Sequence, residues 1–310
     1  MNMKDIYSHE QKRCPHRPST PIGINLPNSH WIRRDYGSKS VTIENITEAY
    51  DKAAQGNGFS EEFVWSDAER EAIKKYGFIT DNLHTDLHEC LGHGSGQLLP
   101  GVSANAMGEF ASALEEARAD LFGLYYMAEP KLVELGILPS QEAYKPHYAN
   151  YIRNGLMVQL TRIELGRKVT EAHMQNRQLI AAWCYEKGKA ENVIEKKVRD
   201  GKTYFVVNDY EALRTLFGKL LAEIQRIKSE GDYEAGKALV LNYGVNVDPE
   251  LHREVKERYE ALGLKPYGGF VNPDIVPVEK DGKVVDYEIR YADDFLAQQL
   301  DYCHRYGILK

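Results

Sequence analysis

Apolar positions recur three and four residues apart along most of the chain from about Thr47 onward. This spacing places them on one face of an α-helix, and good helix formers fill the positions between them. Helices are therefore expected over residues 61–76, 81–93, 104–127, 141–163, 170–186, 210–229 and 233–241. Asp248 followed by Pro249 predicts the start of another helix, because Asp favours the N-cap and Pro the first turn. A last helix is expected over about 292–306.

Strand patterns are few. Residues 203–208 alternate in a β-branched and aromatic run, and residues 276–278 and 284–289 flank a Lys-Asp-Gly turn that predicts a hairpin. Prolines keep the N-terminal forty residues irregular or extended: Pro15, Pro18, Pro21 and Pro27. We therefore expect a mainly α fold with a minor β component from the N- and C-terminal segments.

Composition and charge narrow the class of protein. A chain of 310 residues can bury a sizeable core, in one large domain or two. The balance of 39 Lys and Arg against 46 Asp and Glu gives a net charge of −7, so we expect no nucleic-acid partner. The sequence shows no apolar run long enough to cross a bilayer and no apolar signal segment. With 4 cysteines and no C-x-x-C pair, we expect a cytoplasmic protein without a membrane partner.

One segment places two histidines around a glutamate: His88-Glu89-Cys90-Leu91-Gly92-His93. In the usual zinc-binding helix the histidines are four apart and point within about 40° of each other. Five apart, on a regular helix, they would diverge by about 140°. Either the pair is not a metal site, or a π-type turn brings the two side chains together. Gly92 is the residue expected to tolerate such a distortion most easily.

A catalytic zinc site needs a third protein ligand, and the next helical run offers adjacent carboxylates, Glu115 and Glu116. Adjacent helical residues point about 100° apart, so only one of them can face the metal, while the other could orient a histidine. Taken alone, each motif also fits a structural role, as a solvated charged face or as one core and one surface histidine. Their combination favours a metal site.

The two motifs together resemble the paired signature of the dipeptidyl peptidase III family, zinc exopeptidases that remove dipeptides from peptide N-termini. Two further segments agree with this resemblance. Residues 23–28, with 32–33 and 37–41 after them, resemble the family's substrate-binding strand segment. Residues 171–177 resemble the segment that holds a second active-site histidine.

The resemblance implies the roles of the metal-site residues. His88, His93 and Glu116 would bind one Zn²⁺ per chain, and Glu89 would activate the attacking water as general base. Glu115 would hold a ligand histidine in place from outside the ligand set.

The resemblance also implies residues that act on the substrate. His173 would help to stabilise the transition state, and Arg177 would support that region. Asn25 and Asn28 would hydrogen-bond the backbone and the amino end of an oligopeptide held as an added strand.

Members of this family are considerably longer, and their N-terminal part builds most of a β-rich lower lobe. By the resemblance, residues 1–55 and 267–310 belong to that lobe, and residues 56–266 form the helical catalytic lobe with the zinc site. The expected function is a zinc metallopeptidase that releases dipeptides from the N-terminus of oligopeptides. The alternative is a catalytically silent zinc-binding fragment that needs the missing N-terminal lobe as its partner. A helical scaffold without metal would require every motif to be a coincidence.

Overall fold

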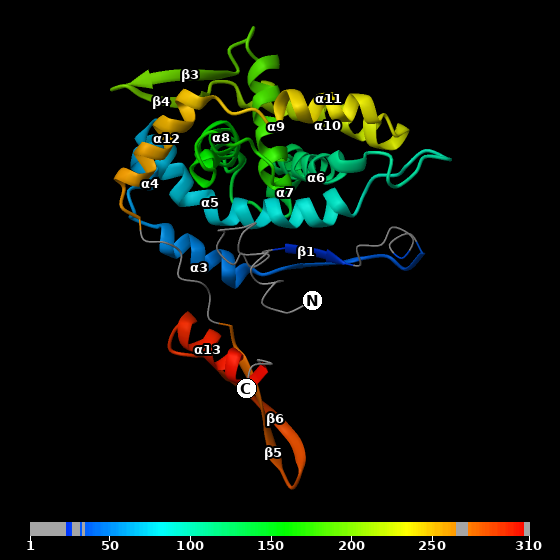
Figure 1. Ribbon diagram of the computed structural model, residues 1–310, viewed down its shortest axis with the longest axis vertical. Helices are drawn as coiled ribbons and strands as arrows, with labels where there is room; N and C mark the ends of the chain where they lie inside the picture. Colours follow the sequence, from blue (N-terminus) through cyan, green and yellow to red (C-terminus); the bar gives the residue numbers. More distant parts are fainter. Residues whose placement is uncertain (1–22, 27–31, 33–34, 265–271, 307–310) are drawn as a thin grey trace. The chain divides into compact units, whose positions relative to one another are not determined.

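The computed structural model describes residues 23–26, 32, 35–264 and 272–306 (Figure 1). In that part the chain is mainly helical, and its strands form only antiparallel pairs, β1 with β2, β3 with β4 and β5 with β6. The prediction of a mainly α fold is confirmed. The described residues fall into two compact units, a larger one within Pro21–Leu264 and a smaller C-terminal one within Lys265–Lys310.

The larger unit begins with the strand pair β1 (Gly23–Leu26) and β2 (Lys39–Thr42). Its helical elements are α3 (Glu44–Ala54), α4 (Phe59–Phe63), α5 (Asp67–Leu87), the π-helix η1 (His88–His93), the 3-10 turn η2 (Gly108–Phe110), α6 (Ala111–Met127), α7 (Pro130–Glu134), α8 (Tyr144–Leu156), the 3-10 turn η3 (Val158–Arg162), α9 (Ala172–Lys187), α10 (Tyr210–Glu230), α11 (Tyr233–Tyr243) and α12 (Pro249–Ala261). The hairpin of β3 (Ile194–Arg199) and β4 (Lys202–Val207) follows α9. The smaller unit holds the hairpin of β5 (Asp274–Lys280) and β6 (Lys283–Arg290) and the helix α13 (Phe295–Tyr306).

Helix α6 forms the centre of the larger unit. It packs against α5, α9, α10 and η1, and Figure 1 shows it between α5 and α10. Its residues Leu114, Ala117, Leu121 and Leu124 are fully buried. Because α6 is buried nearly all round, the charged side chains that it carries must be paired inside the protein.

The segment that leads to His88 and His93 differs from the prediction, which was a pair of helices over 61–76 and 81–93. Residues 67–87 form one continuous helix, α5, and η1 follows it without a break. The side chain of Ser66 accepts a hydrogen bond from the backbone N of Glu69 and so starts α5. The helix continues past Gly77, and the hydroxyl of the buried Thr80 donates to the backbone carbonyl of Tyr76 at 2.9 Å.

Other boundaries follow local chemistry. The predicted strand at 203–208 is confirmed as β4, but its partner β3 was missed because its sequence, Ile-Glu-Lys-Lys-Val-Arg, is mostly charged. The C-terminal hairpin is confirmed, and its turn residues Asp281 and Gly282 both have positive φ. Asp248 caps α12 as predicted, accepting from the backbone N of Glu250. No helix in the part of the chain described above combines the length and apolar character of a membrane span.

Candidate active site

The π-helix η1 aims two histidines at each other. His88 and His93 occupy its two ends, and their Nε2 atoms lie 3.1 Å apart with the rings nearly perpendicular. The wider turn of a π-helix brings residues five apart onto the same face. The predicted π-type turn is therefore confirmed, and the divergence expected of a regular helix does not occur.

Gly92 is needed for a reason that the sequence did not reveal. A Cβ atom at Gly92 would lie 2.6 Å from the Cα of Ala119 on α6. Its backbone needs no positive φ, so the glycine is required for close packing of η1 on α6 rather than for conformational freedom. This close approach brings the carboxylates of α6 within reach of the two histidines.

Glu116 on α6 completes the cluster. Its Oε2 atom lies 3.3 Å from His88 Nε2 and 3.7 Å from His93 Nε2. Although this oxygen is buried, it accepts no hydrogen bond within the described residues. A tetrahedral site with bonds of about 2.0–2.1 Å would hold its ligand atoms about 3.3 Å apart. The spacing and the unsatisfied oxygen fit one divalent metal ion held by the three atoms.

Glu115 lies behind His93. Its Oε1 accepts from His93 Nδ1 at 2.9 Å, and its carboxylate also binds Arg118 and Lys228. Burial opposes the charge of Glu115, but the hydrogen bonds from His93 and Arg118 outweigh it and hold the pKa of Glu115 well below its usual range. An ionised carboxylate can only accept, so His93 carries its proton on Nδ1 and its Nε2 lone pair is available to a metal.

Asp120, one turn after Glu116 on α6, does the same for His88. Its Oδ1 lies 2.7 Å from His88 Nδ1. Burial opposes the charge of Asp120, but hydrogen bonds from His84 and His88 outweigh it and hold the pKa of Asp120 well below its usual range. No role for Asp120 was predicted from the sequence. The available signal was its spacing of four from Glu116, which places both carboxylates on one helix face.

Glu89 is buried and lines the same cavity, of about 720 Å³, as the cluster. Gly23 on β1 leaves the space that it occupies, because a Cβ atom at Gly23 would lie 2.9 Å from Glu89 Oε1. The strand β1 therefore borders the glutamate directly.

His173, on the first turn of α9, also lines the cavity. Its Nε2 lies 3.4 Å from Glu116 Oε2, and its Nδ1 lies 2.8 Å from Glu171 Oε1. The hydrogen bond with Glu171 raises the pKa of His173 and outweighs its partial burial. The protonated form of His173 is therefore favoured, and its ring can donate a hydrogen bond at the edge of the cluster.

The other predicted residues lie away from the cluster or outside the described part. Arg177 donates to Gln159 at 3.4 Å rather than to any of the clustered carboxylates. Asn25 belongs to β1, paired with Ser40, but its side chain is not among those described. Asn28 lies outside the described residues.

Comparison with known proteins decides the family. Residues 17–107 and 100–288 match the model of peptidase family M49. The chain belongs to peptidase family M49. The resemblance to the dipeptidyl peptidase III family is confirmed, because the M49 chain also matches curated proteins and solved structures of that name.

The M49 chain is 27% identical over 263 residues to dipeptidyl peptidase 3 of Nematostella vectensis, covering 72% of this chain and 35% of that protein. It is 27% identical over 268 residues to dipeptidyl peptidase 3 of Mus musculus, covering 74% of this chain and 36% of that protein. The chain thus spans about a third of these relatives. The structure of DPP III from Caldithrix abyssi matches with a TM-score of 0.58 at 24% identity, over 77% of this chain and 42% of that one, and supports the fold.

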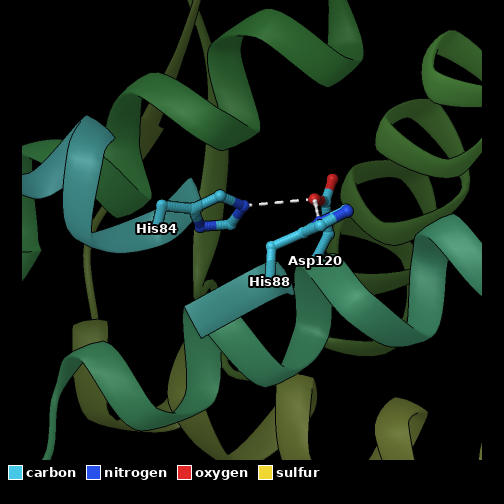
Figure 2. A group of neighbouring side chains, drawn as sticks. All are labelled: His84, His88 and Asp120. Atoms are coloured by element: carbon cyan, nitrogen blue, oxygen red, sulfur yellow. Dashed lines mark hydrogen bonds and ion pairs between the residues drawn. The ribbon is translucent and has the colours of Figure 1, made fainter. Parts of the chain in front are cut away.

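A second group of side chains in the M49 chain lies on the far side of His88 from Glu116. Figure 2 shows His84 on α5 and Asp120 on α6, with Asp120 bonded to both His84 and His88. Farther from His88, His147 on α8 contacts His84. This group was not predicted from the sequence.

Proposed function

We propose that this chain carries the catalytic zinc centre of a dipeptidyl peptidase. The observation that carries the proposal is the convergence of His88 Nε2, His93 Nε2 and the unsatisfied Glu116 Oε2. Two imidazoles and one carboxylate are a ligand set typical of catalytic zinc, which keeps a further position open. One Zn²⁺ per chain would be held in this way, with Glu115 orienting His93.

A zinc ion bound there would supply Lewis acidity, which lowers the pKa of a bound water and polarises a carbonyl. Glu89, next to a proposed ligand and facing the cavity, would take the proton from the water and pass it to the leaving amine. His173 would donate a hydrogen bond to the oxygen that becomes negative in the transition state. Arg177, through its contact with Gln159, would support the helix that carries His173.

We further propose an oligopeptide substrate, bound from its amino end. Strand β1 lines the cavity through Gly23 and Ile24, so a peptide laid beside it would be held by main-chain hydrogen bonds. Asn25 and Asn28 would fix its backbone and amino end. Residues 1–55 and 267–310 would belong to a β-rich lobe, with 56–266 as the catalytic lobe.

The competing proposal is that the chain binds zinc but is silent without the rest of the enzyme. The match covers only 35% of the relative from Nematostella vectensis, so most of that protein has no counterpart in the matched region. The two proposals share the metal site and differ in turnover.

The test is release of a chromogenic amine from a dipeptidyl-arylamide by the purified chain, with zinc content determined on the same sample. Chelator-sensitive release would support a working peptidase. One zinc per chain without release would support the silent fragment, and absence of bound zinc would contradict both.

A further inference from the structure

The side chains behind His88 form a continuous chain of hydrogen bonds across three helices. His84 Nε2 lies 3.1 Å from Asp120 Oδ1, and His147 Nε2 lies 3.2 Å from His84 Nδ1. His147 Nδ1 in turn lies 3.0 Å from Oδ1 of Asp81, which belongs to the C-terminal part of α5. This series of hydrogen bonds runs from the buried His88 to the exposed carboxylate of Asp81.

The direction of these bonds follows from the two carboxylates. An ionised carboxylate only accepts, so His84 carries a proton on Nε2 and His147 carries one on Nδ1. Burial is the largest influence on His84 and lowers its pKa, so its one proton stays on Nε2, and its Nδ1 faces His147 Nε2 at 3.2 Å. His84 is thus a neutral imidazole that is fixed as a donor to Asp120.

Asp120 is held in place by more than its bond to His88. Its Oδ2 accepts from the hydroxyl of Tyr151 at 2.6 Å and from Asn176 at 3.2 Å, while its Oδ1 is shared by His84 and His88. The carboxylate is buried, with donors from α5, η1, α8 and α9. Removing His84 would leave His88 as the one donor to Oδ1 among the described residues, so the carboxylate would lose one of the bonds that fix its position.

The packing between α5 and α6 leaves room for the imidazole ring of His84. A Cβ atom at Gly123 on α6 would lie 2.9 Å from His84 Nδ1 and 3.0 Å from its Cε1. The glycine therefore leaves the space that the imidazole occupies beside α6, where it reaches Asp120.

A second metal ion is the other reading of this group, because His84, His88 and Asp120 could together contact one. His88 would then have to bind metal through both ring nitrogens, which requires removal of both of its protons. The hydrogen bonds to Asp120 already satisfy Nδ1 of His88 and Nε2 of His84. The geometry favours hydrogen bonding over a second ion.

We propose that His84 is a positioning residue for the metal centre. It holds the Asp120 carboxylate that orients His88, and the contact with His147 helps to hold the imidazole of His84 in place. This inference rests on the proposed zinc site, but it concerns metal affinity and does not require peptide turnover.

The test is zinc affinity of the full chain by competition with a chromophoric chelator. His84→Met removes the donor at similar side-chain volume, and His84→Gln keeps an N–H donor at the reach of Nε2. We expect His84→Met to weaken zinc binding about 10-fold or more and His84→Gln to restore it to within about threefold of the unmodified chain. The absorption spectrum of the Co²⁺-substituted protein should shift in His84→Met and return in His84→Gln.

His252→Met is the matched control. His252 is also buried and loses a hydrogen bond, to the carbonyl of Ile163, but it does not line the cavity. It should lower the free energy of unfolding without changing zinc affinity or the Co²⁺ spectrum.

Unchanged zinc affinity in His84→Met would overturn the positioning role, and so would equal losses in His84→Met and His84→Gln. Two zinc ions per chain, one of them lost in His84→Met, would show that the group is a metal site instead. Failure of the unmodified chain to bind zinc would overturn the proposed centre together with this inference. Absence of peptide turnover with zinc bound would count only against the proposed peptidase.

Discussion

At the scale of single residues, the cluster pairs each imidazole with its own carboxylate. His93 Nδ1 bonds to Glu115 and His88 Nδ1 bonds to Asp120, so both Nε2 atoms face the same point. Such partners fix the tautomer and raise the basicity of a metal-binding imidazole. The arrangement explains why α6 carries three carboxylates in six residues, Glu115, Glu116 and Asp120.

Glu89→Gln separates the proposed base from the proposed ligands. The amide keeps the size of the side chain but cannot take a proton, so turnover should fall by a factor of about 10²–10⁴ while zinc stays bound. The measurement is amine release and zinc content on one sample. Glu134→Gln, on the exposed surface of α7, is the control and should change neither. Normal turnover in Glu89→Gln would remove Glu89 from the role of base.

His173 should titrate above the usual range for histidine, because Glu171 stabilises its cation. Glu171 itself has its pKa lowered to about 2, since the hydrogen bonds from His173 outweigh its partial burial. The pair therefore stabilises the fold fully between the ordinary pKa values of glutamate, 4.5, and histidine, about 6.5. It loses this contribution as pH rises through the raised pKa of His173 or falls toward the lowered pKa of Glu171. In Glu171→Gln the pKa of His173, followed by NMR, should fall. An unchanged titration would contradict the proposed pairing.

The residues of the site could be predicted only in part. The adjacent carboxylates Glu115 and Glu116 point about 100° apart on a helix. Helix geometry alone therefore left open which of them faces the histidines. The structure turns Glu116 toward both Nε2 atoms and Glu115 toward His93 Nδ1. His84 and His147 were not predicted because they are 63 residues apart and meet only through the packing of α5 on α8.

At the scale of elements, the contact between η1 and α6 governs the metal site. Gly92→Ala should force these two elements apart, because the new Cβ would overlap the backbone of Ala119. Overpacking of this kind costs about 1–3 kcal/mol of unfolding free energy, and the separation should also weaken zinc binding. Denaturant unfolding and chelator competition measure the two effects.

Gly77→Ala is the matched control within α5. A Cβ atom there would lie 3.6 Å from Ile73, an ordinary contact, so the change should raise stability by up to about 1 kcal/mol through helix propensity. If Gly92→Ala behaved like Gly77→Ala, the close packing of η1 on α6 would not be needed.

Helical periodicity predicted the elements of the larger unit better than their ends. The capping pair Asp248-Pro249 was visible in the sequence and starts α12 as expected. The predicted helix over 104–127 begins only at Ala111, after a 3-10 turn, and that over 141–163 ends in another. Periodicity does not distinguish an α-helix from a tighter turn at its ends.

At the scale of the whole molecule, the proposed zinc site ties together elements from distant parts of the chain. An ion held by η1 and α6 would bind the folded chain but not the separated segments. Zinc at about 1,000 times its dissociation constant should raise the free energy of unfolding by about 4 kcal/mol. Thermal unfolding with and without zinc measures this, and His88→Ala should abolish the difference. Equal stabilisation in His88→Ala would place the bound zinc elsewhere.

The family could be predicted from motifs that occur in the expected order along the chain. The division into lobes was inferred only from the resemblance to a longer protein. Residues 17–107 and 100–288 match the M49 model, and they include the histidine and carboxylate motifs. The assignment of residues 1–55 and 267–310 to a second lobe stays a prediction, because a lobe built largely by other residues leaves no complete pattern in this sequence.

The central claim is one zinc ion bound by His88, His93 and Glu116. Anomalous diffraction at the zinc absorption edge, from crystals of the zinc-loaded chain, tests it most directly. We expect a single anomalous peak within about 2.0–2.2 Å of His88 Nε2, His93 Nε2 and a Glu116 carboxylate oxygen. A peak between His84 and Asp120 instead, or no peak on the chain, would contradict it.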